Sequence, residues 1–143
     1  MSPRDTRTGG VLEVTILPAL HRNGYTYQKQ VNIGHRIGGG RHIVDVLVTT
    51  ADERQLLVSL KWQQTSGTAE QKVPFEVICL AEAIRTSDGK YDKAYLVLGG
   101  DGWRPSLKSY YISGKLNEHL RYSDLVSIVS LEGFMTLANK RQL

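Results

Sequence analysis

Two short apolar segments separated by a polar turn constrain the fold of this chain most strongly. Residues 41–49 and residues 55–63 are rich in valine, leucine and isoleucine and have the length of buried strands. Only residues 51–54 form the polar turn between them, so the two strands are predicted to pair antiparallel. A carboxylate, Asp45, interrupts the first segment, and an ammonium, Lys61, interrupts the second. Because such groups are costly to bury unless they are paired, hydrogen-bonded or metal-bound, this hairpin is the first candidate for a functional site.

The remaining apolar patterns predict a chain of interspersed helices and strands. Helical spacing predicts a first helix over residues 10–22, in which Pro18 removes a backbone donor and is expected to kink or shorten the helix. A second helix is expected over residues 70–86, or from Pro74 onward if that proline occupies the first turn. The other predicted elements are strands at 25–33, 94–98 and 125–130 and helices at 106–112 and 132–139.

This order of elements, αβββαβαβα, predicts an α/β fold. Helices on both faces of a mixed central β-sheet give a three-layer sandwich. Strand 94–98 is expected to run parallel to strand 55–63 because a helix separates them. The glycine-rich stretches 38–40 and 99–102 are short and lie between apolar segments. We therefore expect them to be tight connections within a single domain that covers residues 1–143.

Composition excludes several classes of protein. With 41% hydrophobic and 22% charged residues, a chain of 143 residues is expected to bury a core, which argues against wholesale disorder. No apolar run approaches the roughly 20 residues of a membrane span, and residues 1–7 lack the apolar core of a signal peptide, so a cytoplasmic location is expected. The lone Cys79 lies in an apolar stretch and is expected to be a buried, reduced thiol. A net charge of +4 permits a polyanionic partner.

Strand alternation predicts that the polar residues of the hairpin gather on one side of the sheet. Asp45 is expected on the face opposite to the valines at 44, 46 and 48. On the second strand, alternation puts Ser59, Lys61 and Gln63 on one face, where they can converge with Asp45. A plain ion pair between Asp45 and Lys61 on an exposed sheet face would also account for this pattern.

The spacing of these residues resembles the PD-(D/E)XK nuclease superfamily. The acid Asp45 lies 14 positions before Ser59, which begins the tripeptide Ser59-Leu60-Lys61. The αβββαβ order of the superfamily core matches the order predicted above. The segment from Lys61 to Glu76 is also similar to the KxQ…G(T/S)xxxK pattern of restriction-type members. The resemblance covers about residues 10–100.

The resemblance implies a role for each polar residue of the hairpin. Asp45 would hold a divalent ion, usually Mg²⁺ or else Mn²⁺, with the backbone carbonyl of Leu60 as a further ligand. Lys61 would activate or position the attacking water, and Gln63 would orient water or contact a phosphate. Ser59 stands where the superfamily has its second acid, and a serine hydroxyl is a weak metal ligand. Such a hard cation suits phosphodiester hydrolysis because it neutralises charge on the scissile phosphate.

Three glutamates are candidates to replace the acid that is missing at Ser59. Some members with this substitution recover the charge from the following helix, which here offers Glu76 and Glu70. Helical geometry favours Glu76 slightly, because it is helical whether the helix starts at residue 70 or at Pro74. Glu13 is the only acid in the first predicted helix and is the third candidate, since many members add a first-helix glutamate. For each of them an ordinary solvated carboxylate is the alternative interpretation.

Basic residues near the hairpin are candidates for contact with a nucleic acid. Arg36, Arg41 and His42 flank the glycine stretch at 38–40 just before the Asp45 strand, and such a flexible basic loop suits phosphate contacts. Lys72 follows the glycine-containing segment after Lys61 and is a candidate for contact with the DNA backbone, although a solvated lysine is the alternative.

These observations predict a Mg²⁺-dependent endonuclease that cuts double-stranded DNA, of restriction or homing type. One active site per chain would call for a homodimer or a larger assembly to cut both strands. Two alternatives stay open: a structure-specific nuclease such as a Holliday junction resolvase, and a non-catalytic DNA-binding or assembly module in which Ser59 marks a decayed site. Zinc-ligand spacing, a phosphate-binding P-loop and a nucleophile elbow are all missing from the sequence.

Overall fold

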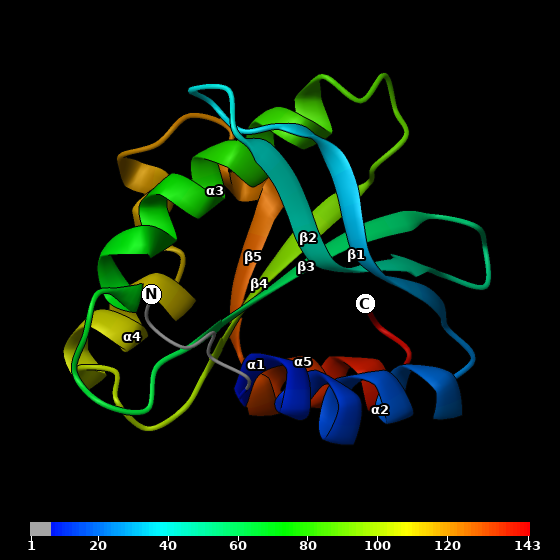
Figure 1. Cartoon of the computed structure of the whole chain (residues 1–143), viewed down its shortest axis with the longest axis horizontal. Helices are drawn as coiled ribbons and strands as arrows, with labels where there is room; N and C mark the ends of the chain where they lie inside the picture. The colour runs from blue at the N-terminus through cyan, green and yellow to red at the C-terminus, as the bar shows by residue number, and fades with distance from the viewer. Residues whose placement is uncertain (1–6) are drawn as a thin grey trace.

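The computed structural model describes residues 7–143, which form a five-stranded mixed sheet with helices on both sides (Figure 1). No helix within this range is long and apolar enough to cross a bilayer. The helical elements are α1 (Arg7–Val11), the π-helical turn η1 (Leu12–Ile16), α2 (Leu17–Arg22), α3 (Ala69–Arg85), α4 (Pro105–Ile112), the short 3-10 turns η2 (Lys115–Glu118) and η3 (Ser123–Leu125), and α5 (Leu131–Asn139). The strands are β1 (Thr26–His35), β2 (Arg41–Thr49), β3 (Gln55–Trp62), β4 (Lys93–Gly99) and β5 (Val126–Ser130).

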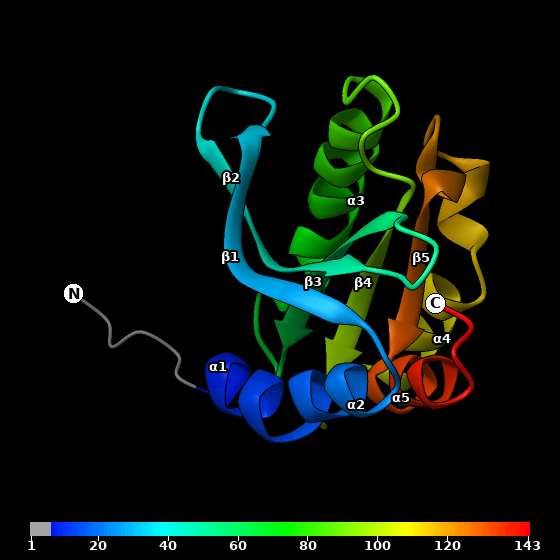
Figure 2. The same cartoon turned by 90° about the vertical axis from the view of Figure 1, so that its right-hand side faces the viewer.

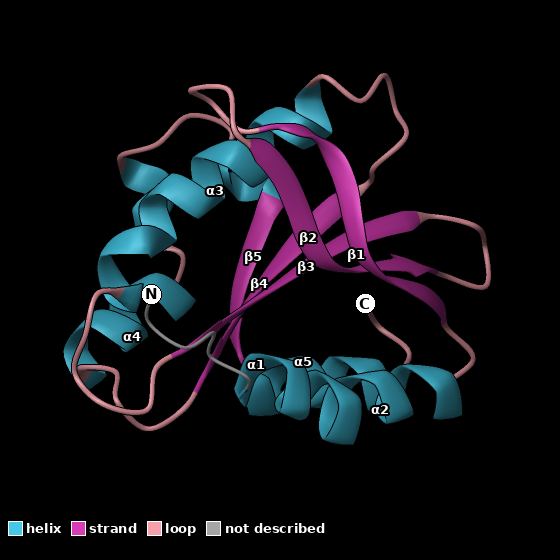
Figure 3. Ribbon diagram, in the orientation of Figure 1, coloured by secondary structure: helices cyan, strands magenta, loops and turns pink. Residues whose placement is uncertain are grey.

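The sheet has the strand order β1-β2-β3-β4-β5 and changes from antiparallel to parallel at its centre. β1 pairs with β2, and β2 with β3, in antiparallel fashion, whereas β3–β4 and β4–β5 are parallel (Figure 3). The predicted antiparallel hairpin and the predicted parallel fourth strand are both confirmed. The reason is the connection length, because a helix lies between β3 and β4 and carries the chain back to the same end of the sheet.

Helices cover the sheet on both faces, so the predicted three-layer α/β sandwich is confirmed. On one face α3 and α4 pack on the sheet through a core that includes Leu57, Leu80 and Leu96. On the other face the N-terminal helical segments and α5 pack through a second core that includes Ile16 and Phe134 (Figures 1 and 2). The apolar side chains of β3 and β4 alternate between the two cores, which is why both faces of these central strands carry apolar residues.

The alternation of side chains reverses once in the β1–β2 hairpin, and this contradicts the sequence-based assignment of faces. Val46 belongs to the core beneath α5, but Val44 belongs to the core beneath α3, although both were expected on one face. Regular pairs lie on both sides of the reversal, at Lys29↔Val46 and Val31↔Val44. Gln30 lies between them in a left-handed conformation with φ 53°. One residue outside the β region reverses the alternation, and the outer half of the hairpin consequently bends toward α3 (Figure 2).

A π-helical turn accommodates Pro18 in the N-terminal helix. The helical path runs from Arg7 to Arg22, and the backbone N–H of Leu17 donates to the carbonyl of Leu12, five residues earlier. This wider turn immediately precedes the proline, which has no N–H to continue the ordinary ladder. The predicted helix at 10–22 is therefore present, and the expected distortion takes the form of the π-helical turn.

Helix α3 begins at Ala69, so the alternative start at Pro74 is wrong. Pro74 lies inside the helix and cannot donate to the carbonyl of Glu70, four residues earlier. The hydroxyl of Tyr111 in α4 donates to that carbonyl at 2.8 Å and replaces the missing bond. The predicted start at residue 70 is thus confirmed within one residue, and this long-range compensation explains why the local proline rule suggested the later start.

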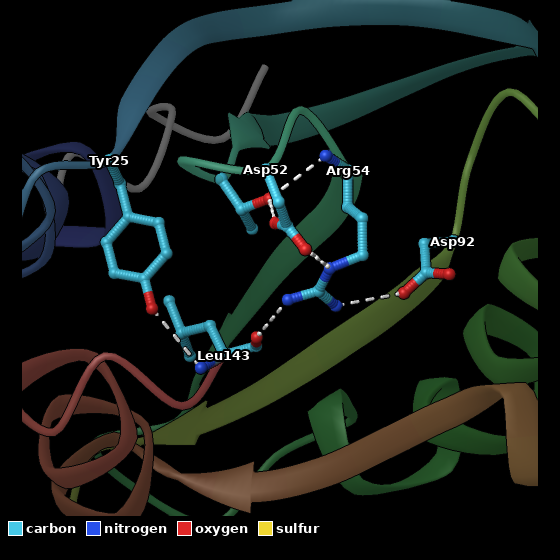
Figure 4. A network of polar contacts seen from close by, with 6 residues as sticks. Tyr25, Asp52, Arg54, Asp92 and Leu143 are labelled. Carbon is cyan, nitrogen blue, oxygen red and sulfur yellow. Dashed lines mark hydrogen bonds and ion pairs between the residues drawn. The ribbon is translucent and has the colours of Figure 1, made fainter.

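Arg54 ties together three segments at the end of the sheet where the β2–β3 turn lies (Figure 4). Its guanidinium contacts Asp52 in that turn at 3.1 Å, Asp92 before β4 at 3.2 Å and the carbonyl of Leu143 at 3.2 Å. The backbone N–H of Leu143 donates to the hydroxyl of Tyr25 at 3.3 Å. This network holds residue 143 against the sheet and is separate from the acid and base pair of the hairpin.

Candidate active site

The side chain of Asp45 in β2 accepts a hydrogen bond from the backbone of β3. The paired register of these strands begins at Val46↔Val58, so Asp45 lies one residue beyond it. The Oδ2 atom of Asp45 accepts a hydrogen bond from the backbone N–H of Leu60 at 2.7 Å. The strands separate at the point where the alternation reverses, and the carboxylate thus lies between β2 and the final residues of β3.

Glu76 on α3 is buried beside this carboxylate, with three basic side chains around it. Its Oε2 atom is 2.5 Å from Nη1 of Arg36 and 4.0 Å from Nζ of Lys61, and its Oε1 atom is 3.2 Å from Nε2 of His42. Arg36 closes the tip of the β1–β2 hairpin, His42 belongs to β2 and Lys61 to β3. Side chains from the hairpin tip, from β2 and from β3 therefore meet on one helical carboxylate, because the hairpin bends over α3.

The two carboxylates have opposite electrostatic environments. Burial is the largest influence on Glu76 and by itself would raise its pKa, but the hydrogen bond to His42 and the charges of Lys61 and Arg36 outweigh it and lower the pKa to about 2. Burial also raises the pKa of Asp45, and there the Leu60 N–H and the Lys61 charge offset it only in part. The negative charge of Glu76 raises the pKa of Asp45 further. The site thus combines Glu76, whose ionised form is stabilised, with Asp45, whose ionised form is disfavoured by burial.

Lys61 and Ser59 complete the polar side of β3. The Lys61 side chain is 24% exposed, and its charge acts on both Asp45 and Glu76. Ser59 is buried two residues earlier on the same strand face. The hairpin pattern predicted that Asp45 and Lys61 share one side of the sheet, and in the structure the Lys61 ammonium lies near Asp45 and also near Glu76. It is not an exposed ion pair, because Asp45 and Glu76 are both largely buried.

A comparison of the sequence with protein-family models matches residues 4–142 to the PD-(D/E)XK nuclease superfamily domain. The chain belongs to the PD-(D/E)XK nuclease superfamily. The resemblance inferred from the hairpin and the helix order is thereby confirmed. No curated protein matches the sequence significantly.

Several solved structures are similar to this chain at low sequence identity. A repair endonuclease from Pyrococcus abyssi has a TM-score of 0.46 and 15% identity over 93% of this chain and 48% of its own. The complex of EndoMS with double-stranded DNA has a TM-score of 0.43 and 20% identity over 93% of this chain and 47% of its own. A crystal structure described as a protein of unknown function has a TM-score of 0.46 and 8% identity over 80% of this chain and 54% of its own. The chain thus spans about half the length of the structures that it matches.

Of the three glutamates expected to replace the missing superfamily acid, only Glu76 lies at Asp45. Glu70 is buried at the start of α3, where its Oε2 atom accepts from the backbone N–H of Arg104 at 3.1 Å and contacts its Nε at 3.3 Å. Glu13 is exposed and pairs with Lys29 at 2.7 Å. Glu70 and Glu76 are six positions apart, which separates them by about 9 Å along the helix. The expectation that Glu70 joins the Asp45 cluster is corrected by its engagement with the loop after β4.

Gln63 has a structural position that the superfamily pattern did not suggest. Its amide Nε2 donates to the carbonyl of Gly102 at 2.9 Å, and its Oε1 accepts from the backbone N–H of Ala69 at 3.1 Å. A Cβ at Gly100 would lie 2.3 Å from the carbonyl oxygen of Gln63, so this loop requires glycine there. Both ends of the amide are occupied by backbone groups, and the expected contact of Gln63 with water or phosphate is replaced by a bridge between β3, α3 and the loop.

The basic residues divide into exposed and buried groups. Arg41 and Lys72 are exposed and form no ion pair within residues 7–143, so they are accessible to a phosphate backbone. Arg36 is partly exposed and reaches inward to Glu76. His42 is 1% exposed, which corrects the expectation that it contacts DNA. Its position in β2 alternates inward where the exposed neighbours Arg41 and Ile43 alternate outward.

The donor set of the site fits a hard divalent cation. The carboxylates of Asp45 and Glu76, the hydroxyl of Ser59 and the carbonyl of Leu60 are all oxygen ligands, which Mg²⁺ and Mn²⁺ prefer. Across the part of the chain that the structure describes, no group of three or more His, Cys, Asp and Glu side chains could hold a metal ion. Among these residues the site has only two carboxylates, Asp45 and Glu76. This number is sufficient for Mg²⁺, which commonly uses one or two carboxylates together with waters and substrate phosphates.

The two partners of Glu76 that sequence reasoning missed are Arg36 and His42. Both were recognised as basic residues near the glycine stretch, but alternation and loop composition gave them a role on the DNA surface. The bend at Gln30 turns this part of the hairpin toward α3, and a glutamine in a strand gives no signal for a left-handed conformation. The buried thiol of Cys79, which was predicted, lies three residues after Glu76 on α3.

Proposed function

We propose that this chain is a divalent-metal-dependent endonuclease that hydrolyses phosphodiester bonds in double-stranded DNA. The observation that carries the proposal is the meeting of Asp45, Glu76 and Lys61 at one end of the sheet in a chain of the PD-(D/E)XK nuclease superfamily. Glu76 supplies from α3 the negative charge that Ser59 does not supply from β3. With the second acid on α3 in place of β3, the site still combines two carboxylates, Asp45 and Glu76, with the ammonium of Lys61.

Asp45, Glu76 and the carbonyl of Leu60 would hold Mg²⁺ or Mn²⁺. When bound, such an ion neutralises charge on the scissile phosphate and lowers the pKa of a water molecule. The ammonium of Lys61 would donate to the attacking water or to a phosphate oxygen and orient it between the two carboxylates. The N–H of Leu60 fixes the orientation of Asp45, so the carboxylate does not need to reorganise during the reaction.

Exposed cations beside the site would bind the DNA backbone. Arg41 extends from the base of the hairpin loop, and Lys72 from the first turns of α3, so both lie on elements that also carry residues of the site. Contacts of this kind position the duplex without reading its sequence. Because each chain offers one such site, cutting of both strands would require a homodimer or higher homo-oligomer.

The test is cleavage of supercoiled plasmid by the purified protein in the presence of Mg²⁺ or Mn²⁺, with Asp45→Asn and Lys61→Met beside the wild type. We expect both substitutions to lower the cleavage rate by about 10³-fold or more. Asp45→Asn is expected to fold well, because burial penalises the charge that the substitution removes. Glu13→Gln is the matched control and is expected to cut at the wild-type rate, because Glu13 is exposed and lies outside the site.

The products of cleavage distinguish the finer versions of the proposal. Discrete fragments from linear duplex DNA are expected for a restriction or homing enzyme. Cleavage confined to four-way junctions or other branched substrates would replace this version with a structure-specific nuclease. Failure to cut any duplex, branched or single-stranded DNA with either metal would contradict the enzymatic proposal and favour a non-catalytic DNA-binding module.

A further inference from the structure

Arg36 occupies the carboxylate oxygen of Glu76 that faces Lys61. Its Nη1 atom lies 2.5 Å from Oε2, the same oxygen that is 4.0 Å from the Lys61 ammonium. The backbone of Arg36 closes the hairpin tip, because its N–H donates to the carbonyl of Gly40 and its carbonyl accepts from Gly39. The main chain is thus held in a tight turn while the long side chain reaches inward across the site.

Charge balance favours either Arg36 or a divalent ion beside Glu76, but not both at the same time. The formal charges of Asp45, Glu76, Lys61 and Arg36 are two negative and two positive, so these four side chains balance one another. Addition of a divalent cation would give a net charge of +2 in a largely buried space, where unbalanced charge is costly. Departure of Arg36 at the same time reduces this excess to +1, and a DNA phosphate that enters the site would cancel it.

We propose that Arg36 holds Glu76 in the place of the metal ion in the free protein and passes to a DNA phosphate when the metal ion binds. The proposal rests on the function proposed above. The side chain of Arg36 is 28% exposed, so solvent and solutes reach part of it. A guanidinium binds phosphate in the same bidentate manner as it binds carboxylate, so the exchange replaces one good partner by another.

His42 keeps Glu76 in position during this exchange. It contacts Oε1, whereas Arg36 contacts Oε2, so the two basic side chains divide the carboxylate between them. His42 is buried in β2 and is held by the sheet, and Arg36 is a side chain on an exposed hairpin tip. Loss of Arg36 therefore frees one oxygen for a metal ion while the other oxygen remains anchored. His42 acts as a positioning residue in this arrangement.

The exchange links the affinities for metal and for DNA. If DNA withdraws Arg36 from Glu76, it removes a competitor of the metal ion, and the metal affinity rises. By thermodynamic reciprocity, the metal ion raises the affinity for DNA by the same factor. Free protein would then bind metal weakly, and the complete site would form on the nucleic acid.

Calorimetric titration with Mn²⁺ in the absence of DNA tests the competition directly. We expect Arg36→Gln to bind Mn²⁺ about tenfold more tightly than the wild type, because it removes the charge that competes for Oε2. Arg41→Gln is the matched control on the same hairpin; it removes an exposed charge of the same kind and is expected to keep the wild-type affinity. Equal or weaker Mn²⁺ binding by folded Arg36→Gln would overturn the proposal.

A second titration tests the linkage with arginine in place. In the cleavage-deficient background Lys61→Met, Mn²⁺ is titrated with and without a short DNA duplex, and DNA is expected to tighten Mn²⁺ binding. An Mn²⁺ affinity that does not respond to DNA would overturn the proposal even if Arg36→Gln failed to fold. These readouts are independent of cleavage: a wild type that cuts DNA but shows neither effect refutes only the exchange, and a protein that shows both but cuts nothing refutes only the nuclease.

Discussion

Two buried glutamates of α3, Glu70 and Glu76, show how differently one helix can use the same side chain. Both are about 95% buried, and both contact an arginine that lies far away in sequence. Glu70 faces the backbone N–H and the side chain of Arg104, in the loop after β4. Glu76 faces side chains from the hairpin and from β3, and it lies close to the second acid, Asp45.

The two glutamates differ in whether their hydrogen-bond partners can move away. A backbone N–H that is fixed by the fold cannot move away from Glu70, so this carboxylate serves to hold the loop. The partners of Glu76 include two long cationic side chains that reach solvent, and another carboxylate that shares its ligand chemistry. Burial and an arginine partner therefore do not identify a catalytic carboxylate. A second acid nearby and exchangeable partners are more informative.

The largest expected effect that separates the two glutamates is on DNA cleavage. Glu76→Gln should lower the cleavage rate by about 10³-fold or more, corresponding to about 4 kcal/mol, because it removes one of the two proposed acidic ligands. Glu70→Gln should leave the rate within about threefold, since its carboxylate contacts no residue of the Asp45 site. Plasmid cleavage under saturating Mn²⁺ measures both. Equal losses in the two variants would mean that Glu70 and Glu76 do not differ in their importance for cleavage.

The next effect is on acid stability. Because the pKa of Glu76 is lowered from 4.5 to about 2, its ionised form stabilises the folded state at any pH above 4.5, and this contribution disappears as the pH falls from 4.5 through 2. The shift corresponds to about 3 kcal/mol at neutral pH. Glu76→Gln should therefore lower the free energy of unfolding by about this amount at pH 7, as measured by urea denaturation.

The pH series supplies its own control. The difference between wild type and Glu76→Gln should shrink between pH 4.5 and pH 2 as the wild-type carboxylate becomes protonated. A difference that stays constant over this interval would mean that the substitution acts through packing and not through the charge of Glu76.

Much of the fold could be predicted from local patterns. The hairpin of β2 and β3, the helix between β3 and β4 and the parallel pairing that follows depend on apolar runs and connection length, which the sequence displays directly. The predicted start at residue 70 was within one residue of Ala69, but local sequence could not exclude Pro74, because the carbonyl freed by Pro74 is satisfied by Tyr111 on another helix. The reversal of inward and outward side chains at Gln30 could not be predicted either, because the sequence gives no signal for the left-handed conformation of this residue.

The sequence predicted the central pair of the candidate site, Asp45 and Lys61, but not all of the residues around it. Asp45 and Lys61 stand in β-branched strands where a charge is conspicuous, and their spacing resembles the superfamily. The choice among Glu76, Glu70 and Glu13 depended on which helical face met the hairpin, and periodicity alone left it open. Buried His42 escaped prediction for the same reason that the bend did, because its inward direction follows from the path of β2.

A smaller effect is expected at the Glu70 end of α3 from Tyr111→Phe. The substitution removes the hydroxyl that donates to the Glu70 carbonyl, leaving a buried acceptor without its partner inside a proline-containing helix. We expect the free energy of unfolding to fall by about 1–2 kcal/mol and the cleavage rate to stay unchanged. Urea denaturation and plasmid cleavage measure the two. A loss of cleavage in the folded variant would show that the two ends of α3 are coupled.

The smallest effect is expected from Glu70→Gln on stability. Burial by itself would raise the pKa of Glu70, but the Arg104 N–H, the contact with Gln63 and the Arg104 guanidinium outweigh it and lower the pKa. The ionised form therefore stabilises the fold above the ordinary pKa, and the contribution is lost as the pH falls below it. Because the Arg104 side chain is 69% exposed, solvent screens its charge, and a glutamine oxygen can still accept from the backbone N–H. Thermal unfolding at pH 7 should show a lower midpoint than wild type, with a smaller decrease than for Glu76→Gln. The reverse order would mean that the loop contact, and not the hairpin cluster, is the stronger of the two networks.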